Sequence, residues 1–267
     1  MTIDGMVSAN GSGTGPGNGG AGAGGSIWIT TQTLNGSGYI KANGGSRTSN
    51  PSGGGGRIAV YYTNGNFPVT NTNGSPANMQ AYGGTTYNYS PAGPGTIYVK
   101  NTDGDPENLG SIYVDNNGNN GSAAGLPAQA SYEFDLIKLT RYGYLDVLGT
   151  STVLNLANGS GLNGDSTYPD LRVDGTFNYT GATENPAVPE LFMNGLDLWI
   201  NGEITGVDDV TIGNVAKGGM TFSAKTWAHD NTTPYTLGAV DIQGTSTMTM
   251  IGYDNPANST DYGVTLN

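Results

Sequence analysis

The stretch "GGSIWIT", from Gly24 to Thr30, decides the fold because its pattern returns three times in the first half of the chain. The later copies are "GGRIAVYY" from Gly55 to Tyr62, "PGTIYVK" from Pro94 to Lys100 and "LGSIYVD" from Leu109 to Asp115. In each copy a glycine precedes a short strand in which Ile or Val recurs at every second position, so these side chains share one face. The copies are about 31, 39 and 15 residues apart. The pattern predicts a repeat of stacked strands with loops of variable length.

Glycine tracts precede the first two of these strands. "GPGNGGAGAGG" (Gly15–Gly25) leads into the first strand and "SNPSGGGG" (Ser49–Gly56) leads into the second. A linker between domains does not usually recur in register with strands. We therefore expect the glycines to form corner loops of successive coils, with the strands that follow them stacked.

Composition supports an ordered all-β protein. Of the 267 residues 46 are glycine and only 11% are charged, whereas disorder normally combines low hydrophobicity with high net charge. Apolar residues cluster in short alternating runs, and no window keeps the spacing of an amphipathic helix without Gly, Pro or Asn interrupting it.

Two all-β architectures compete, a right-handed parallel β-helix and an antiparallel β-sandwich. Asx-Gly and Gln-Gly dipeptides most often form hairpin turns, but they also suit the bends of a solenoid. They occur at Asp174-Gly175, Asn194-Gly195, Asn201-Gly202 and Gln243-Gly244. The recurring strand pattern favours the β-helix, because a sandwich predicts no self-similarity. We expect one solenoid over residues 1–267, with glycine-rich long-loop coils in 1–130 and short-loop coils in 131–267.

Runs such as "LDVLGTSTVLNLANGSG" and "LDLWINGEITGVDDVTIG" resemble the repeats of secreted bacterial β-helix proteins, including adhesin passenger domains. The glycine-rich first half is similar to repeats of large bacterial surface proteins. The resemblance implies an extracellular, non-enzymatic structural or adhesive module of a larger bacterial surface protein. The alternative that it leaves open is a β-helix polysaccharide hydrolase or lyase with an acidic groove.

Charge and cysteine usage limit the partners. The net charge is −12 with nine basic residues, so there is no Lys/Arg cluster to neutralise nucleic-acid phosphates or an anionic membrane. The acidic, Lys-poor and cysteine-free composition favours a secreted bacterial protein at the cell surface. The chain begins and ends within strand-like patterns, so we expect a segment of a longer protein. The open strand edges of an excised solenoid also predict end-to-end self-association.

Carboxylates are the candidate catalytic groups. The sole histidine, His229, lies in a polar turn and does not suggest a nucleophilic triad. A glycosidase needs two carboxyl groups about 5 to 9.5 Å apart across the scissile bond. The residues selected for this role are Asp174, Glu203, Asp208 and Asp209, from a wider set that also contains Asp197 and Asp241.

The turn "NTDGDPENLG" is the candidate metal site. Asp103, Asp105 and Glu107 alternate around it, and such oxygens suit Ca²⁺, although the turn lacks the final acidic ligand of an EF-hand loop. Calcium is therefore the one cofactor that the sequence suggests, with a plain acidic turn as the alternative.

Exposed aromatic rings are the candidate sugar-binding groups, because a ring face packs against the apolar CH face of a sugar. Aromatic residues are frequent in the strands and loops, and in a strand every second one can instead belong to the core. Tyr61 and Tyr62 must face opposite sides of their strand. The candidates are Tyr61, Tyr62, Tyr87, Trp199 and Trp227, with Trp28 and Tyr98 in the same wider set.

Overall fold

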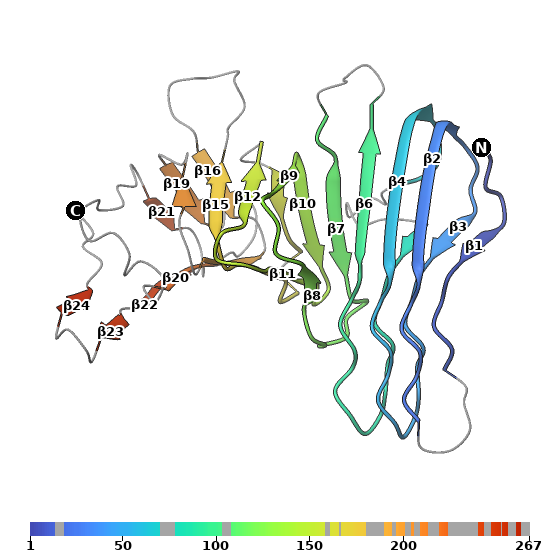
Figure 1. The fold of residues 1–267 in the computed structure, drawn as a ribbon, viewed down its shortest axis with the longest axis horizontal. Helices are drawn as coiled ribbons and strands as arrows, with labels where there is room; N and C mark the ends of the chain where they lie inside the picture. Colours follow the sequence, from blue (N-terminus) through green and yellow to red (C-terminus); the bar gives the residue numbers. More distant parts are fainter. Residues whose placement is uncertain are drawn as a thin grey trace.

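Strands are the principal regular elements, as the sequence predicts, and the protein is nearly all β with several parallel sheets. The computed structural model describes residues 1–13, 19–69, 78–102, 108–157, 161–165, 167–179, 190–193 and 196–200, and after these only the strands named below. The strands follow one another in chain order along the long axis of the molecule (Figure 1).

The first third of the chain forms two facing stacks of parallel strands. One stack contains β1 (Met6–Ser8), β3 (Tyr39–Lys41) and β5 (Met79–Gln80), and the other contains β2 (Ser26–Leu34), β4 (Arg57–Gly65) and β6 (Thr96–Asn101). The register in the second stack aligns Ile27 with Ile58 and Ile97. The predicted stacking of these three strands is thus confirmed, and their Ile and Val side chains pack into a core between the two stacks.

The fourth copy of the strand pattern departs from the expected repeat. β7 (Ser111–Asp115) pairs with β6 in the antiparallel direction, with Tyr113 opposite Ile97. A parallel neighbour requires a crossover of a dozen or more residues, whereas the short connection between β6 and β7 returns the chain as a hairpin. The spacing of about 15 residues between the two copies is therefore too short for another coil.

This reversal moves the core to the other face of the sheet. Tyr113 packs with Ile97 in the first core, while Ile112 and Val114 point the opposite way into a second core. The next strand, β10 (Leu136–Thr140), pairs in parallel with β7 and places Ile137 beside Ile112 in that second core. Tyr98, on the outer face of the stack of β2, β4 and β6, packs against the edge of the second core.

From β7 to β18 the strands recur in sets of three. The first sets are β7, β8 (Ala124–Leu126), β9 (Ser131–Phe134); β10, β11 (Tyr144–Val147), β12 (Val153–Leu156); and β13 (Leu162–Asn163), β14 (Asp170–Val173), β15 (Thr176–Tyr179). The fourth set is β16 (Glu190–Met193), β17 (Asp197–Ile200) and β18 (Ile204–Thr205). After it, β19 (Asp209–Ile212) pairs with β21 (Val240–Ile242), and β20 (Gly219–Ser223) pairs with β22 (Thr247–Ile251). The last strands are β23 (Tyr253–Asn255) and β24 (Thr260–Tyr262).

Each strand from β7 to β15 pairs in parallel with its counterpart in the following set, apart from β13, for which no such ladder is found among the described strands. One inward ladder joins Leu145, Leu171 and Leu198, all fully buried. The last pair, β23 and β24, is antiparallel.

Asp174-Gly175 forms a corner and not a hairpin. It connects β14 to β15, and these two strands belong to different sheets. The chain therefore bends between two sheets at this dipeptide and does not form a hairpin. The dipeptides at 194–195, 201–202 and 243–244 lie outside the described residues.

The described parts of the glycine tracts, residues 19–25 and 49–56, form extended segments that run beyond the strands, in the lower right of Figure 1. Gly24 N donates to Gly54 O at 2.8 Å, and Gly55 N donates to Gly93 O at 3.0 Å, so segments of successive repeats are hydrogen-bonded to one another. A Cβ on Gly24 would collide with Ala42 O, and one on Gly55 would collide with Ala81 O. Glycine is needed here because the backbones approach so closely. The sequence analysis expected corner loops at these positions, and the structure shows extended segments that are hydrogen-bonded to one another.

Candidate functional site

The outer face of β2, β4 and β6 gathers side chains that the core does not use. Because Ile29, Val60 and Val99 point inward, the alternate positions of each strand point outward. These outward positions are Ser26, Trp28 and Thr30 on β2, Arg57, Ala59 and Tyr61 on β4, and Thr96, Tyr98 and Lys100 on β6.

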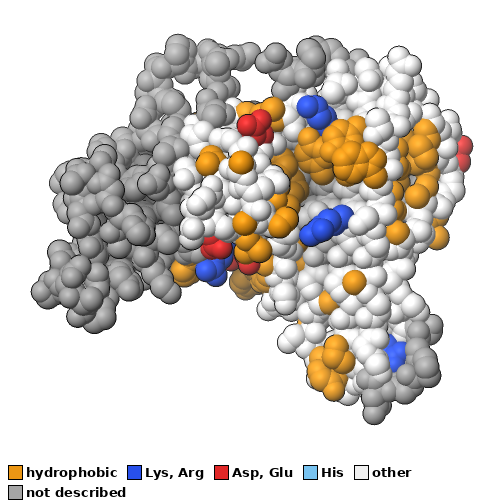
Figure 2. Space-filling model, viewed as in Figure 1, with side chains coloured by type: hydrophobic (Ala, Val, Ile, Leu, Met, Phe, Trp, Pro, Cys, Tyr) orange, Lys and Arg blue, Asp and Glu red, His pale blue; other side chains and the backbone are white. Residues whose placement is uncertain are grey.

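Three aromatic rings form a continuous row across this face. The ring of Trp28 stacks on Tyr61 with centroids 4.8 Å apart, and Tyr61 lies 5.5 Å from Tyr98. The row continues into the second core, where Tyr98 lies 6.1 Å from the buried ring of Phe134. We call Trp28, Tyr61 and Tyr98 the aromatic row. Figure 2 shows hydrophobic side chains gathered over this part of the sheet, with basic side chains above and below them.

The two ends of the aromatic row differ in exposure. Trp28 is 71% exposed, and its indole Nε1 donates to Thr30 Oγ1 at 3.0 Å. Tyr98 is anchored, because its hydroxyl donates to Leu109 O at 2.7 Å. Burial, followed by the nearby Tyr61 and Asp135, raises the pKa of Tyr98 to about 12, so its phenol stays neutral. The aromatic row is therefore anchored at Tyr98 and exposed to solvent at Trp28.

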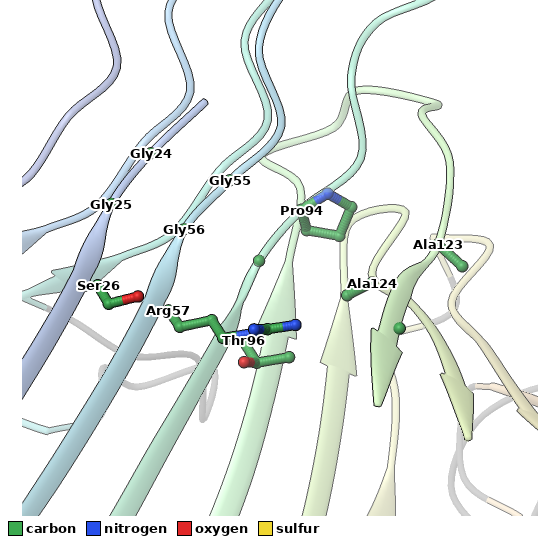
Figure 3. A pocket seen from close by; sticks show the side chains of 12 residues that line it. Gly24, Gly25, Ser26, Gly55, Gly56, Arg57, Pro94, Thr96, Ala123 and Ala124 are labelled. Carbon is green, nitrogen blue, oxygen red and sulfur yellow. The ribbon is translucent and has the colours of Figure 1, made fainter. Parts of the chain in front are cut away.

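A cavity of about 310 Å³ lies beside the aromatic row, on the same face. Its walls are backbone from successive repeats, formed by Gly24 and Gly25, Gly55 and Gly56, Pro94 and Gly95, and Ala123 with the first two residues of β8, Ala124 and Gly125. Ser26, Arg57 and Thr96 stand side by side at its rim, one from each strand, because the register pairs them. Figure 3 shows the Arg57 side chain extending from β4 toward Thr96.

The structure brings only part of the predicted sugar-binding set together. Tyr61 lies in the aromatic row, while Tyr62 faces the opposite way and packs against the first core, as the alternation requires. Tyr87 is 88% exposed and lies beyond a glycine segment. Trp199 lies on β17, beside Arg172 of β14, in another sheet. Trp227 lies outside the described residues.

Of the predicted catalytic carboxylates only Asp174 can be placed in detail. Its Oδ1 lies 3.5 Å from Nε of Arg172 on the outer face of β14. Asp209 begins β19 and is aligned with Glu190. Asp208 and Glu203 lie outside the described residues.

Three other aspartates line the sheet of β11, β14 and β17. Asp197 belongs to the wider set of sequence candidates, whereas Asp146 and Asp170 were not considered. The register sets Asp170 directly beside Asp197, and Asp146 beside Arg172. Burial, followed by the charges of Asp197 and Asp146, raises the pKa of Asp170 to about 6, against the opposing effect of Arg172. Oδ1 of Asp170 is buried without a hydrogen-bond partner. Asp170 and Asp197 occupy matching positions of successive strands. This match could have identified Asp170 from the sequence, but it can be recognised only when the register of the strands is known.

The predicted calcium ligands Asp103, Asp105 and Glu107 lie outside the described residues. Among the residues that the structure does describe, no group of three or more His, Cys, Asp or Glu side chains could hold a metal ion. Within that same part of the chain, no helix has the length and apolar character needed to cross a membrane.

Comparison of the chain with protein-family models, with curated proteins and with solved structures finds no match. The site must therefore be interpreted from its own geometry.

Proposed function

We propose that this chain is a non-enzymatic module of a bacterial cell-surface protein, built as a right-handed parallel β-helix that binds carbohydrate on its outer face. Three observations support the architecture: parallel pairing between successive sets of strands, buried Leu and Val ladders, and a corner at Asp174-Gly175. Parallel strands joined by a crossover are right-handed in nearly all known cases, which gives the hand.

The aromatic row is the observation that carries the binding role. A stacked pair whose outer member is 71% exposed offers apolar ring area to a ligand without any further ordering of side chains. Aromatic faces of this kind suit the CH faces of pyranose rings. An acidic, lysine-poor surface and a polar exterior fit a protein that works outside the cell.

Binding of the purified protein to an array of glycans, followed by calorimetry on the best ligand, tests this function. Replacing Trp28 with Ala should weaken binding about five- to tenfold, since one aromatic contact is worth about 1 kcal/mol. Tyr87→Ala is the matched control, because Tyr87 is an exposed ring away from the aromatic row. The proposal fails if no glycan binds, or if the two variants bind alike.

A second candidate, a polysaccharide hydrolase, is favoured by one observation, the pairing of Asp170 with Asp197. A carboxyl group with its pKa raised to about 6 beside a second carboxylate is the arrangement that supplies a general acid and its partner. Release of reducing ends from polysaccharides by the wild type, lost in Asp170→Asn, would support the hydrolase over a purely binding module. Binding without release in both proteins would exclude it.

A further inference from the structure

The rim of the glycine-lined cavity carries an arginine, Arg57, whose charge acts on the phenol of Tyr132. In the described ranges no carboxylate forms an ion pair with Arg57, whereas Arg141 and Arg172 both pair with aspartates. Arg57 is exposed and stands between the hydroxyl-bearing side chains of Ser26 and Thr96. An unpaired guanidinium between two hydroxyl groups is a ready set of hydrogen-bond donors for an anion.

Charge on this face has the opposite sign to that of the whole protein. The chain has 21 acidic and nine basic residues, yet the only charged side chains at the outward positions of β2, β4 and β6 are Arg57 and Lys100. The carboxylate of Asp135 acts on Tyr98 of the aromatic row, and its Oδ2 already accepts from the backbone N–H groups of Leu109 and Gly110. The face is therefore locally basic around an apolar centre.

The cavity itself is a consequence of chain packing. Its glycines are required because the segments of successive repeats touch, as the collisions at Gly24 and Gly55 show. The glycines alone therefore do not identify a ligand. The features that indicate the ligand are the basic side chain of Arg57 at the rim and its distance from the aromatic row.

That distance follows from the strand geometry. Arg57 is aligned with Thr96, two positions before Tyr98 on the same face of β6. Two positions along a strand span about 7 Å. A short oligosaccharide lying on the aromatic row can therefore place a substituent of one of its rings at Arg57.

We propose that the ligand of the aromatic row is an anionic polysaccharide of the uronate class, whose carboxylate binds to Arg57 at the rim of the cavity while its rings stack on Trp28 and Tyr61. This inference rests on the carbohydrate-binding function proposed above and specifies its ligand class. Arg57 offers a planar fork of donors to the carboxylate, which a lysine cannot reproduce. Lys100 adds longer-range attraction, so binding weakens as salt is raised.

Calorimetric titration with polygalacturonate oligosaccharides, with the same oligosaccharides after reduction of their carboxyl groups, and with dextran sulfate tests this proposal. We expect the wild type to bind the uronate form about tenfold or more tightly than the reduced form. Arg57→Gln should abolish that difference and Arg57→Lys should restore only part of it. Lys41→Gln is the control, because it removes one positive charge from β3, in the other stack.

Each contrary result has a separate meaning. Equal affinity for the uronate and reduced forms overturns the carboxylate at Arg57 and leaves carbohydrate binding intact. Dextran sulfate bound as tightly as the uronate overturns the uronate class in favour of general attraction to polyanions. Absence of binding to all three, together with no binding on the glycan array, overturns the proposed function and this inference with it.

Discussion

Arg141 holds Asp115 through two nitrogen atoms and thereby joins the two halves of the fold. Nη2 lies 2.6 Å from Asp115 Oδ2, and Nε lies 3.0 Å from Oδ1. The same guanidinium donates to the hydroxyl of Tyr82, at the start of a glycine segment of the first stack. The neighbouring Asn116 accepts from Gly83 N and donates to Ala92 O, so the contact continues into the backbone. These bonds secure the junction at which the core changes face.

Breaking this pair should destabilise the protein unequally, depending on which partner is removed. The Asp115 side chain is 2% exposed and the Arg141 side chain is 39% exposed. Arg141→Ala leaves a buried carboxylate without its partner and should cost about 3 kcal/mol, whereas Asp115→Asn leaves an arginine that water can reach and should cost about half as much. Urea denaturation measures both values.

Arg172→Ala is the control for that comparison. Its contact with Asp174 is longer, at 3.5 Å, and both side chains are more exposed, so the loss should stay below about 1 kcal/mol. Equal costs for Arg141→Ala and Arg172→Ala would show that the junction does not depend on this pair.

Asp170 should make the stability depend on pH. Its pKa is about 6 in the folded chain, against about 3.9 for an aspartate in an unfolded chain. Between these values the folded state binds more protons than the unfolded state, so the free energy of unfolding falls as pH rises from about 4 to 6. Asp170→Asn removes this effect, and its stability relative to the wild type should increase over that range by at most about 3 kcal/mol and then level off.

The difference between the two proteins is the quantity to measure, by denaturation at several pH values, because other carboxylates titrate in both. Asp4→Asn is the control, since Asp4 is exposed at the first strand stack. A difference between Asp170→Asn and wild type that stays constant from pH 4 to 7 would contradict the raised pKa.

Local pattern predicted β2, β4 and β6 and their alignment, because Ile or Val at every second position, beginning at Ile27, Ile58 and Ile97, determines which face is buried. The same pattern misled at Ile112. Nothing inside "SIYVD" distinguishes an antiparallel neighbour from a parallel one, and only the short distance from the preceding copy carries that information.

The candidate site shows a similar limit. An aromatic residue at Tyr61 was predicted to bind sugars, but its contact with Trp28 depends on the register of two strands. Arg57 was missed because one basic residue in a strand looks like any solvated charge. Arg57 is significant because the outer face of β2, β4 and β6 places no acidic side chain beside it. A short stretch of sequence cannot show this, because the neighbours come from different strands.

Self-association is expected at the β2 edge of the six-stranded sheet that runs from β13 to β2. β2 is its outermost strand and pairs with β4 on one side. The outer edge of this nine-residue strand presents backbone donors and acceptors to another chain, although near its end the carbonyl oxygen of Thr33 already accepts from the amino group of Met1. The sedimentation coefficient should therefore rise with protein concentration, and a value that stays constant over a hundredfold dilution would argue against association through this edge.

Gly55→Ala should disturb the fold far more than a change of one methyl group normally does. The added Cβ would collide with Ala81 O and also crowd Gly95 N, both of them backbone atoms that neighbouring segments hold in place. Overpacking of this kind costs about 1–3 kcal/mol, which should appear as a lower thermal midpoint. Gly5→Ala is the matched control, because a Cβ there meets nothing within 4 Å and should change stability by less than about 0.5 kcal/mol. Equal midpoints for the two variants would mean that the glycine segments are loosely packed, and the cavity beside Arg57 would then lose its fixed walls.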